Sequence, residues 1–223
     1  MGVGILIMML NGVEVFDKPG ELLDPRHTAL LVIDMQNEIA SDKGGYFQHG
    51  YDIGRVRSII PTIQTLLQAG RGRKIPVVYT EFVHRDRRGV SQMDGPTVYL
   101  HRNEAWVSDV TEGTWQAQTV DELGPAPDDL VLQKSRASAL HGTYLDNFLR
   151  SRGIQTIVLT GCLTDGCVLR TAVHATECGY YAAVAKDAVG SLTAEKHDLG
   201  LKYMAMKFPV FSSDEILAAW KSR

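Results

Sequence analysis

Short apolar runs alternate along this chain with longer stretches in which apolar positions recur at helical spacing. The runs predict strands at residues 28–35, 75–81, 130–132, 156–160, 180–185 and 210–211. The helical spacing predicts helices at residues 56–69, 143–151, 167–177, 193–206 and 215–220. Because strands and helices alternate, the pattern predicts a three-layer α/β/α fold around a doubly wound, mostly parallel six-stranded sheet.

Two stretches fall outside this alternation. Residues from His84 to about Ala126 form a long irregular region rich in Arg, Gly and Asp. Near the N-terminus, Gly4–Leu10 is apolar but lacks the length and the basic flank of a signal peptide or a membrane span. Because no repeat or linker interrupts the pattern, residues 1–223 are predicted to form one domain, with residues 1–21 as an N-terminal extension.

The composition is that of an ordinary soluble globular protein, with 44% hydrophobic and 22% charged residues. A net charge of -3 gives no support to binding of nucleic acid or of an acidic membrane surface. The three cysteines are odd in number and irregularly spaced, so they are not expected to form a disulfide framework. These features favour a cytoplasmic protein.

A cysteine follows the predicted strand at residues 156–160. A turn begins at Gly161, and the next predicted helix has Cys167 in its first turn. A thiol there lies at the positive end of the helix dipole, among backbone N–H groups without helical partners. Such surroundings lower the pKa of a thiol from its usual value of about 8.5. The pattern therefore makes Cys167 a candidate nucleophile.

Three reactive side chains follow the carboxyl ends of three predicted strands. Asp34 lies at the end of the first strand, Lys134 just past the third and Cys167 after the fourth. In doubly wound sheets, ligands bind beyond the carboxyl ends of the strands. We therefore expect Asp34, Lys134 and Cys167 to meet at one edge of the sheet.

Four segments carry a resemblance to a known family. They are LLVIDMQNE at 30–38, EGTWQAQTVDEL at 112–123, the segment at 133–154 that begins QKSRASAL, and the segment at 159–188 that begins LTGCLTDGC. From about residue 22 to its end, the chain resembles the cysteine hydrolases of the isochorismatase-like superfamily. This superfamily includes nicotinamidases, N-carbamoylsarcosine amidases, ureidoacrylate amidohydrolases and biuret hydrolases.

The resemblance implies a catalytic triad of Asp34, Lys134 and Cys167. Asp34 is implied as the general base, and Lys134 as a positive charge that favours thiolate and carboxylate. The oxyanion hole is implied to consist of the N–H groups of Leu163 and Cys167, with a cis peptide bond between Cys162 and Leu163. The implied activity is hydrolysis of a C–N bond in a small ureido, carbamoyl or amide compound, with release of ammonia through a thioester.

The resemblance does not extend to a metal site. Nicotinamidases carry an Asp-x-His motif after the second strand, whereas this chain has Phe82 in place of the Asp and keeps only His84. His49 and His101 have no ligand-like spacing around them. We therefore expect an enzyme without a metal or other cofactor.

Substrate choice is read from a few candidate pocket residues. The segment 37–53, with its Gly-Gly-aromatic sequence, resembles an insertion of ureidoacrylate and biuret-type members, which points to a small-molecule ureide as substrate. The candidate pocket residues are Asn37, Tyr46, Phe47, Glu81, Trp115 and His141. Leu140 stands where many relatives have a Phe, which changes the expected pocket shape. The basic segment 84–89 either meets an acidic substrate or forms a solvated or subunit-contact loop.

Several alternatives remain open from the sequence. The enzyme is a ureide amidohydrolase in the first interpretation, and a nicotinamidase-like or other amide or ester hydrolase in the second. A third is a non-catalytic small-molecule binder or thiol sensor that keeps Cys167. Cys162 and Cys178 are interpreted as small core residues, with a Cys162–Cys167 redox pair as the alternative. Related folds commonly form homodimers or homotetramers, and the resemblance implies the same here.

Overall fold

The computed structural model describes residues 8–84 and 110–221. Its centre is a six-stranded sheet in the order β5-β4-β3-β6-β7-β8, and every strand pairs in parallel with its neighbours. This confirms the predicted fold class. The strands are β3 (Thr28–Ile33), β4 (Val77–Phe82), β5 (Leu130–Lys134), β6 (Thr156–Cys162), β7 (Tyr181–Gly190) and β8 (Val210–Phe211).

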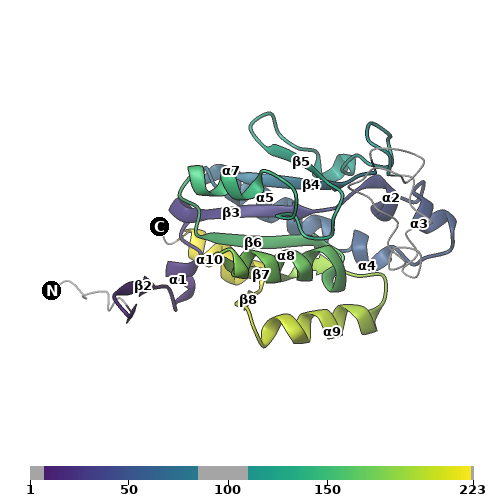
Figure 1. Ribbon diagram of the computed structural model, residues 1–223. Helices are drawn as coiled ribbons and strands as arrows, with labels where there is room; N and C mark the ends of the chain where they lie inside the picture. Colours follow the sequence, from purple (N-terminus) through teal and green to yellow (C-terminus); the bar gives the residue numbers. More distant parts are fainter. Residues whose placement is uncertain (1–7, 85–109, 222–223) are drawn as a thin grey trace.

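Helices cover both faces of the sheet (Figure 1). α5 (Ile60–Gly72) and α10 (Ser213–Lys221) pack on one face, and α7 (Leu145–Ser151), α8 (Leu169–Glu177) and α9 (Ala194–Ala205) on the other. Strand residues alternate between the two cores: Leu30 faces the first and Leu31 the second. Because both faces are covered, β3 and β6 are buried along their whole length, which explains their continuous apolar runs.

Element boundaries differ from the predictions where polar or conformationally special residues intervene. The first strand ends at Ile33 rather than residue 35, because Asp34 has a positive φ of 50°. The predicted helix at 56–69 is split into α4 (Gly54–Arg57) and α5. Short elements that the pattern did not predict are β1 (Met8–Leu10), β2 (Val13–Val15), α1 (Pro19–Leu22), η1 (Pro25–His27), α2 (Asn37–Ala40), α3 (Gly45–Gln48) and η3 (Asp121–Leu123).

The carboxyl ends of the strands face α2 and α3, at the end of the molecule away from both termini (Figure 1). At this end β3 and β6 approach each other closely. A Cβ atom at Gly161 would lie 2.1 Å from the carbonyl oxygen of Ile33, and Gly161 has a φ of +99°. Only glycine satisfies both conditions, so Gly161 fixes the approach of the two strands that carry Asp34 and the Cys162–Cys167 turn.

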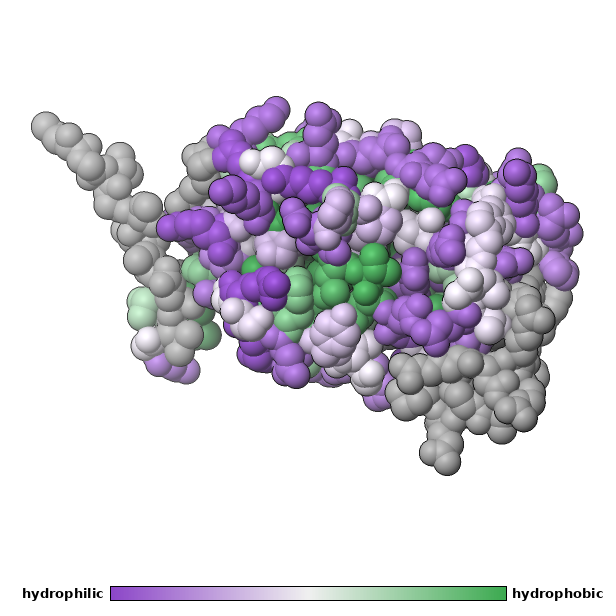
Figure 2. All heavy atoms as spheres, turned by 90° about the horizontal axis from the view of Figure 1, so that it is seen from above, coloured by the Kyte–Doolittle hydropathy of each residue, from purple (hydrophilic) through white to green (hydrophobic). Residues whose placement is uncertain are grey.

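The surface on the β5 side of the sheet is largely hydrophilic, and its most prominent apolar patch lies near its middle (Figure 2). β5 is an edge strand, and its Val131 is 39% exposed. Within residues 8–84 and 110–221, no helix has the length and apolar character needed to span a membrane.

Candidate active site

Asp34 is positioned by strand register. It follows β3 directly, and Ile33 pairs with Thr80 of β4. The hydroxyl of Thr80 donates to Asp34 Oδ1 over 2.6 Å, and the backbone N–H of Asp34 donates to the Thr80 carbonyl over 3.1 Å. Asp34 is only 6% exposed, so its carboxylate is held in one orientation inside the protein.

Lys134, the last residue of β5, joins the other two candidate residues. Its side chain is fully shielded from solvent, and its Nζ lies 2.8 Å from Asp34 Oδ2 and 3.4 Å from Cys167 Sγ. Burial acts to lower the pKa of Lys134, but the interactions of its ammonium group with the Asp34 carboxylate and the Cys167 sulfur outweigh burial and raise this pKa. Lys134 therefore keeps its positive charge between the carboxylate and the sulfur.

Phe82 completes the surroundings of this ammonium group. It pairs with Lys134 in the β4–β5 register, and its ring centroid lies 5.0 Å from Lys134 Nζ. Such a distance permits a cation–π interaction. Phe82 aligns with the Asp of the Asp-x-His motif of nicotinamidases. An aromatic ring therefore lies at the position where that motif has a carboxylate.

Cys167 does not lie in the first turn of a regular α-helix, which corrects the prediction. It belongs to a π-helical turn, η4 (Thr164–Val168), and α8 begins two residues later. Gly166 inside this turn is not helical, with φ -111° and ψ -110°. The turn is closed by the N–H groups of Gly166 and Val168, which both donate to the Leu163 carbonyl. Turns of this kind commonly occur at functional sites.

The expectation of a lowered thiol pKa is also wrong. Burial raises the pKa of Cys167 to about 12, the positive charge of Lys134 opposes this shift, and the charge and hydrogen bond of Asp34 reinforce it. The resting thiol is therefore neutral at physiological pH and hydrogen-bonded to the Asp34 carboxylate. A nucleophile in this state requires a base beside it, and Asp34 is that neighbour.

The peptide bond between Cys162 and Leu163 is cis, at the position that the family resemblance implies. Leu163 and Cys167 bracket the tight turn that follows β6. The two backbone N–H groups assigned to an oxyanion hole thus come from one short segment beside the thiol.

Cys162 has surroundings unlike those of Cys167. It is buried, and its thiol donates to the backbone carbonyl of Asp34 over 3.1 Å. Burial raises its pKa well above the ordinary value, with the charge of Asp34 adding to this effect. All three cysteines, Cys162, Cys167 and Cys178, are free thiols.

Two buried polar residues that the sequence analysis missed organise the site. Thr80 orients Asp34 as described above. Gln36 accepts a hydrogen bond from Phe82 N and donates from Nε2 to the carbonyls of Phe82 and Ala117, at 2.9, 2.9 and 2.7 Å. It thereby ties the end of β4 to the segment 115–119. The sequence did carry a signal for both residues: Thr80 is a polar residue inside an apolar run, and Gln36 directly follows one.

Three of the candidate pocket residues lie near the hydrogen bonds that Gln36 makes between β4 and the segment 115–119. Asn37 is buried and donates from Nδ2 to the Trp115 carbonyl over 2.9 Å. Glu81 Oε1 accepts from the N–H and hydroxyl of Thr119 at 3.0 and 3.2 Å, and burial raises the pKa of Glu81. The indole of Trp115 is partly free, since the residue is 40% exposed. Asn37, Glu81 and Trp115 therefore lie on connected segments next to Asp34.

Tyr46 and Phe47 lie on α3, which packs closely on α2. A Cβ at Gly44 would lie 2.2 Å from the Asn37 carbonyl oxygen, so only glycine permits this approach. The Tyr46 ring packs against that of Tyr51, with centroids 5.4 Å apart, whereas Phe47 is 48% exposed. The Gly-Gly-aromatic sequence thus serves to fold α3 over α2.

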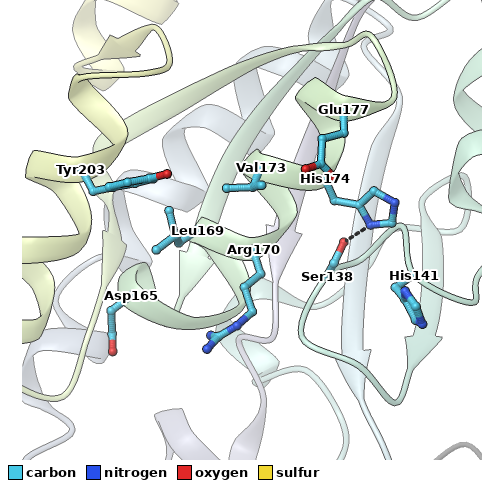
Figure 3. A pocket seen from close by; sticks show the side chains of 9 residues that line it. All are labelled: Ser138, His141, Asp165, Leu169, Arg170, Val173, His174, Glu177 and Tyr203. Carbon is cyan, nitrogen blue, oxygen red and sulfur yellow. Dashed lines mark hydrogen bonds between the residues drawn. The ribbon is translucent and has the colours of Figure 1, made fainter.

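The structure places His141 elsewhere. It lines a surface pocket of about 540 Å³ over the outer face of α8, together with Ser138 and His174 (Figure 3). Its ring centroid lies 6.2 Å from that of His174, and it makes no hydrogen bond to the triad in the part of the chain described. His101 and residues 85–89, which the sequence analysis considered, lie outside the described residues.

A metal-binding cluster of three His, Cys, Asp or Glu side chains is not found among residues 8–84 and 110–221. His49, one of the histidines considered above, instead pairs its Nδ1 with the carbonyl of Gly45 over 2.8 Å.

A parallel α/β sheet with Asp, Lys and Cys joined at its carboxyl edge is the arrangement of an α/β cysteine hydrolase. Residues 28–215 match the family model for the isochorismatase domain. The chain therefore belongs to the isochorismatase family of cysteine hydrolases.

Similar proteins and structures agree with this assignment. The chain is 34% identical to the ureidoacrylate amidohydrolase RutB of Enterobacter sp. (strain 638) over 174 residues, 74% of this chain and 75% of that protein. A cysteine hydrolase from Pseudomonas syringae pv. phaseolicola has the same fold, with a TM-score of 0.78 at 23% identity over 89% and 94% of the two chains. The N-carbamoylsarcosine amidase from Thermoplasma acidophilum gives a TM-score of 0.64 at 27% identity, over 84% and 96%.

Proposed function

We propose that this protein is a cysteine-dependent amidohydrolase that cleaves a C–N bond of a small ureido, carbamoyl or amide compound. One observation carries the proposal: Lys134 Nζ lies 2.8 Å from Asp34 Oδ2 and 3.4 Å from Cys167 Sγ in a buried site. A thiol, a base and a fixed positive charge in mutual contact are the groups that acyl transfer requires.

The first half of the proposed reaction forms a thioester. Asp34 takes the thiol proton as Cys167 Sγ attacks the carbonyl carbon of the substrate, and the carbonyl oxygen becomes an oxyanion. The N–H groups of Leu163 and Cys167 donate to this oxyanion. When the tetrahedral intermediate collapses, the C–N bond breaks, Asp34 returns the proton to the leaving nitrogen, and ammonia departs.

The second half restores the thiol. Asp34, again ionised, takes a proton from a water molecule that attacks the thioester, and then returns it to the departing sulfur. For a ureide R–NH–CO–NH₂ the product is a carbamate, which decomposes to an amine and carbon dioxide. Lys134 stays charged throughout and stabilises whichever of its two neighbours carries the negative charge.

A neutral resting thiol fits this scheme. With the pKa of Cys167 raised to about 12 by burial, the free enzyme holds the proton between sulfur and carboxylate instead of an exposed thiolate. The thiolate then forms as Asp34 takes the proton during the attack, and the neutral resting thiol reacts more slowly with other electrophiles than an exposed thiolate would.

Two arguments favour a ureido or carbamoyl group in the substrate. Both named relatives, a ureidoacrylate amidohydrolase and an N-carbamoylsarcosine amidase, act by name on compounds that carry a terminal –CO–NH₂ on nitrogen. In this chain, half-buried Glu81, with a raised pKa, and buried Asn37 lie on segments next to Asp34, and their side-chain oxygens offer partners for the N–H groups of a ureide. We further propose a reducing, cytoplasmic location, consistent with three free thiols.

The test is ammonia release from ureidoacrylate, biuret, N-carbamoyl amino acids, maleamate and nicotinamide, with Cys167→Ala as the blank. We expect the wild type to release ammonia from at least one ureide, and we expect Cys167→Ala to release none from it. Ammonia release that persists in Cys167→Ala would overturn the cysteine mechanism. Turnover confined to nicotinamide or maleamate would keep the mechanism and overturn the ureide assignment.

A further inference from the structure

The turn that contains Cys167 is attached to α9 as well as to the sheet. η4 follows β6 and leads into α8, and α9 lies beside α8 on the same face of the sheet (Figure 1). Two consecutive residues of this turn, Thr164 and Asp165, make hydrogen bonds to side chains outside it. Neither bond involves a group to which the proposed chemistry gives a role. The bonds therefore act on the shape of the turn.

The first of these bonds comes from α9. Thr164 is fully buried, and its Oγ1 lies 2.9 Å from Nδ1 of His197. His197 is half buried in the first turn of α9, where Thr193 caps the helix by accepting from the N–H of Lys196. Because the cap fixes where the helix begins, it also fixes the imidazole against the turn. A hydrogen-bonding atom is thus held against the residue that directly follows Leu163.

The second bond comes from the end of β7. Asp165 lies on the turn just before α8 (Figure 3), and the hydroxyl of Ser191 donates to its Oδ1 over 2.6 Å. Ser191 is fully buried and directly follows Gly190, the last residue of β7. Gly190 pairs in turn with Cys162 at the end of β6. β7 therefore supports the turn through the sheet and also through this hydrogen bond.

Backbone packs directly on backbone between α9 and the turn. A Cβ atom at Gly200 would lie 3.1 Å from the backbone N of Asp165 and 3.2 Å from its Cα. These distances are tighter than an ordinary van der Waals contact, so a larger residue at position 200 would displace the turn. Gly200 and Met204 are the two buried residues of α9. One of the two buried positions of this helix therefore lies against the turn.

We propose that His197, Ser191 and Gly200 are positioning residues, which hold two backbone N–H groups of the turn in the orientation that an oxyanion requires. These are the N–H groups of Leu163 and Cys167, so the inference rests on the proposed function. The two anchored residues lie between them in the sequence. A shift of the anchored pair therefore moves both N–H groups, and such donors stabilise an oxyanion only from hydrogen-bond distance.

The sulfur of Cys167 is held by other contacts. Its partners are Lys134, whose Nζ lies 3.4 Å away, and the Asp34 carboxylate. Neither partner belongs to α9 or to β7. Loss of an anchor is therefore expected to impair the stabilisation of the oxyanion and to leave the thiol as reactive as before.

A pair of substitutions at His197 separates the hydrogen bond from packing. His197→Phe keeps a ring and removes Nδ1, whereas His197→Asn gives up the ring and keeps a hydrogen-bonding atom near the position of Nδ1. We expect kcat for ammonia release to fall about tenfold in His197→Phe and to stay within about threefold of the wild type in His197→Asn. KM should change less than about twofold in both, because the displaced N–H groups act mainly in the transition state. Packing alone would rank the two variants in the opposite order.

Gly200→Ala tests the backbone contact. The added methyl group has to displace the turn by a few tenths of an ångström, and we expect kcat to fall about tenfold. Asp198→Ala changes an exposed residue of the same helix and should keep the wild-type kcat. Circular dichroism checks that each variant is folded, and the two His197 variants decide the outcome if Gly200→Ala does not fold.

Alkylation by iodoacetamide provides a readout that a loss of stability alone would not separate from turnover. The sulfur of Cys167 displaces iodide in this reaction, and no oxyanion forms. We expect His197→Phe and Gly200→Ala to be alkylated at Cys167 within about twofold of the wild-type rate, although their turnover falls about tenfold.

Three results would overturn the positioning role while leaving the proposed function in place. They are full turnover in His197→Phe, a lower kcat in His197→Asn than in His197→Phe, and a loss of turnover matched by an equal loss of alkylation rate. A wild type that releases ammonia from none of the compounds would overturn the proposed function and this inference with it.

Discussion

Cys162 and Cys167 lie at the two ends of one turn and have opposite surroundings. Burial raises the pKa of both thiols. Cys162 donates to the backbone carbonyl of Asp34, whereas Cys167 contacts the carboxylate of Asp34 and the ammonium group of Lys134. Both cysteines thus lie at or just after the end of β6, and the pKa of each thiol is raised. The two thiols differ in their partners: Cys162 meets the backbone carbonyl of Asp34, whereas Cys167 meets its carboxylate and also the ammonium group of Lys134.

This comparison shows why a motif with two cysteines five residues apart carries two different roles. A thiol that donates to an amide carbonyl has no base to accept its proton. A thiol beside a carboxylate and an ammonium group has both a base and a charge that stabilises the thiolate. We therefore expect variants of the two cysteines, and of the residues around them, to differ sharply.

The largest expected effect is that of Cys167→Ala. Removing a nucleophile abolishes the covalent step, and rate losses of more than about 10⁴-fold are expected. The variant should stay folded, because the lost sulfur lies in a turn and not in the centre of either core. Ammonia release and a thermal unfolding scan check both points. Both cysteines lie in the tryptic peptide 153–170, so a trapped thioester must be assigned by fragmentation of that peptide, and we expect it on Cys167.

Lys134→Met comes second. Without the ammonium group, the pKa of Cys167 should rise further, since the charge and hydrogen bond of Lys134 lower it, and turnover should fall by about 10²–10³-fold. The wild-type alkylation rate of Cys167 should increase with pH without a plateau below about pH 10, and the variant should react more slowly at every pH. An unchanged pH profile would contradict the role of Lys134.

The same variant also tests the buried ion pair. Loss of Lys134 leaves the Asp34 carboxylate buried without its partner, which typically costs about 3–5 kcal/mol in the free energy of unfolding. Urea unfolding should show this loss, and the double variant Asp34→Asn/Lys134→Met should recover part of it. Because the double variant lacks both base and cation, its activity should stay absent while its stability returns.

Thr80→Val is expected to have a moderate effect. The change keeps the shape of the side chain but removes the 2.6 Å hydrogen bond to Asp34 Oδ1, and a buried bond of this kind contributes about 1–2 kcal/mol. We expect turnover to fall about tenfold with little change in KM. Thr80→Ser restores the hydroxyl and should restore most of the rate, which a purely structural role of the methyl group would not explain.

The smallest effect belongs to Cys162→Ala. Its thiol donates to a backbone carbonyl and packs in the core, so turnover should stay within about twofold of the wild type, with a loss of about 1 kcal/mol in unfolding free energy. Ammonia release and urea unfolding of Cys162→Ala, measured beside Cys167→Ala, check both expectations. A large loss of turnover in Cys162→Ala would show that the two cysteines act together, as in a redox pair.

Much of the fold could be predicted because burial on both faces leaves a direct mark on the sequence. Strands such as β3 and β6 are apolar without interruption, and each is followed by a helix with one apolar face. Boundaries were less predictable where single residues leave regular geometry. Asp34 ends β3 through its positive φ, and Gly166 interrupts the helix around Cys167, and neither conformation is marked by hydrophobic periodicity.

The site divides in the same way. The sequence by itself determined that Asp34, Lys134 and Cys167 stand at the carboxyl ends of parallel strands, because residue type and strand pattern are local properties of the chain. Tertiary structure alone decided that Thr80 orients Asp34, that His141 lies over α8, and that the thiol pKa is raised instead of lowered. Burial and the field of neighbouring charges depend on distances between segments far apart in the sequence, and those distances exist only once the chain has folded.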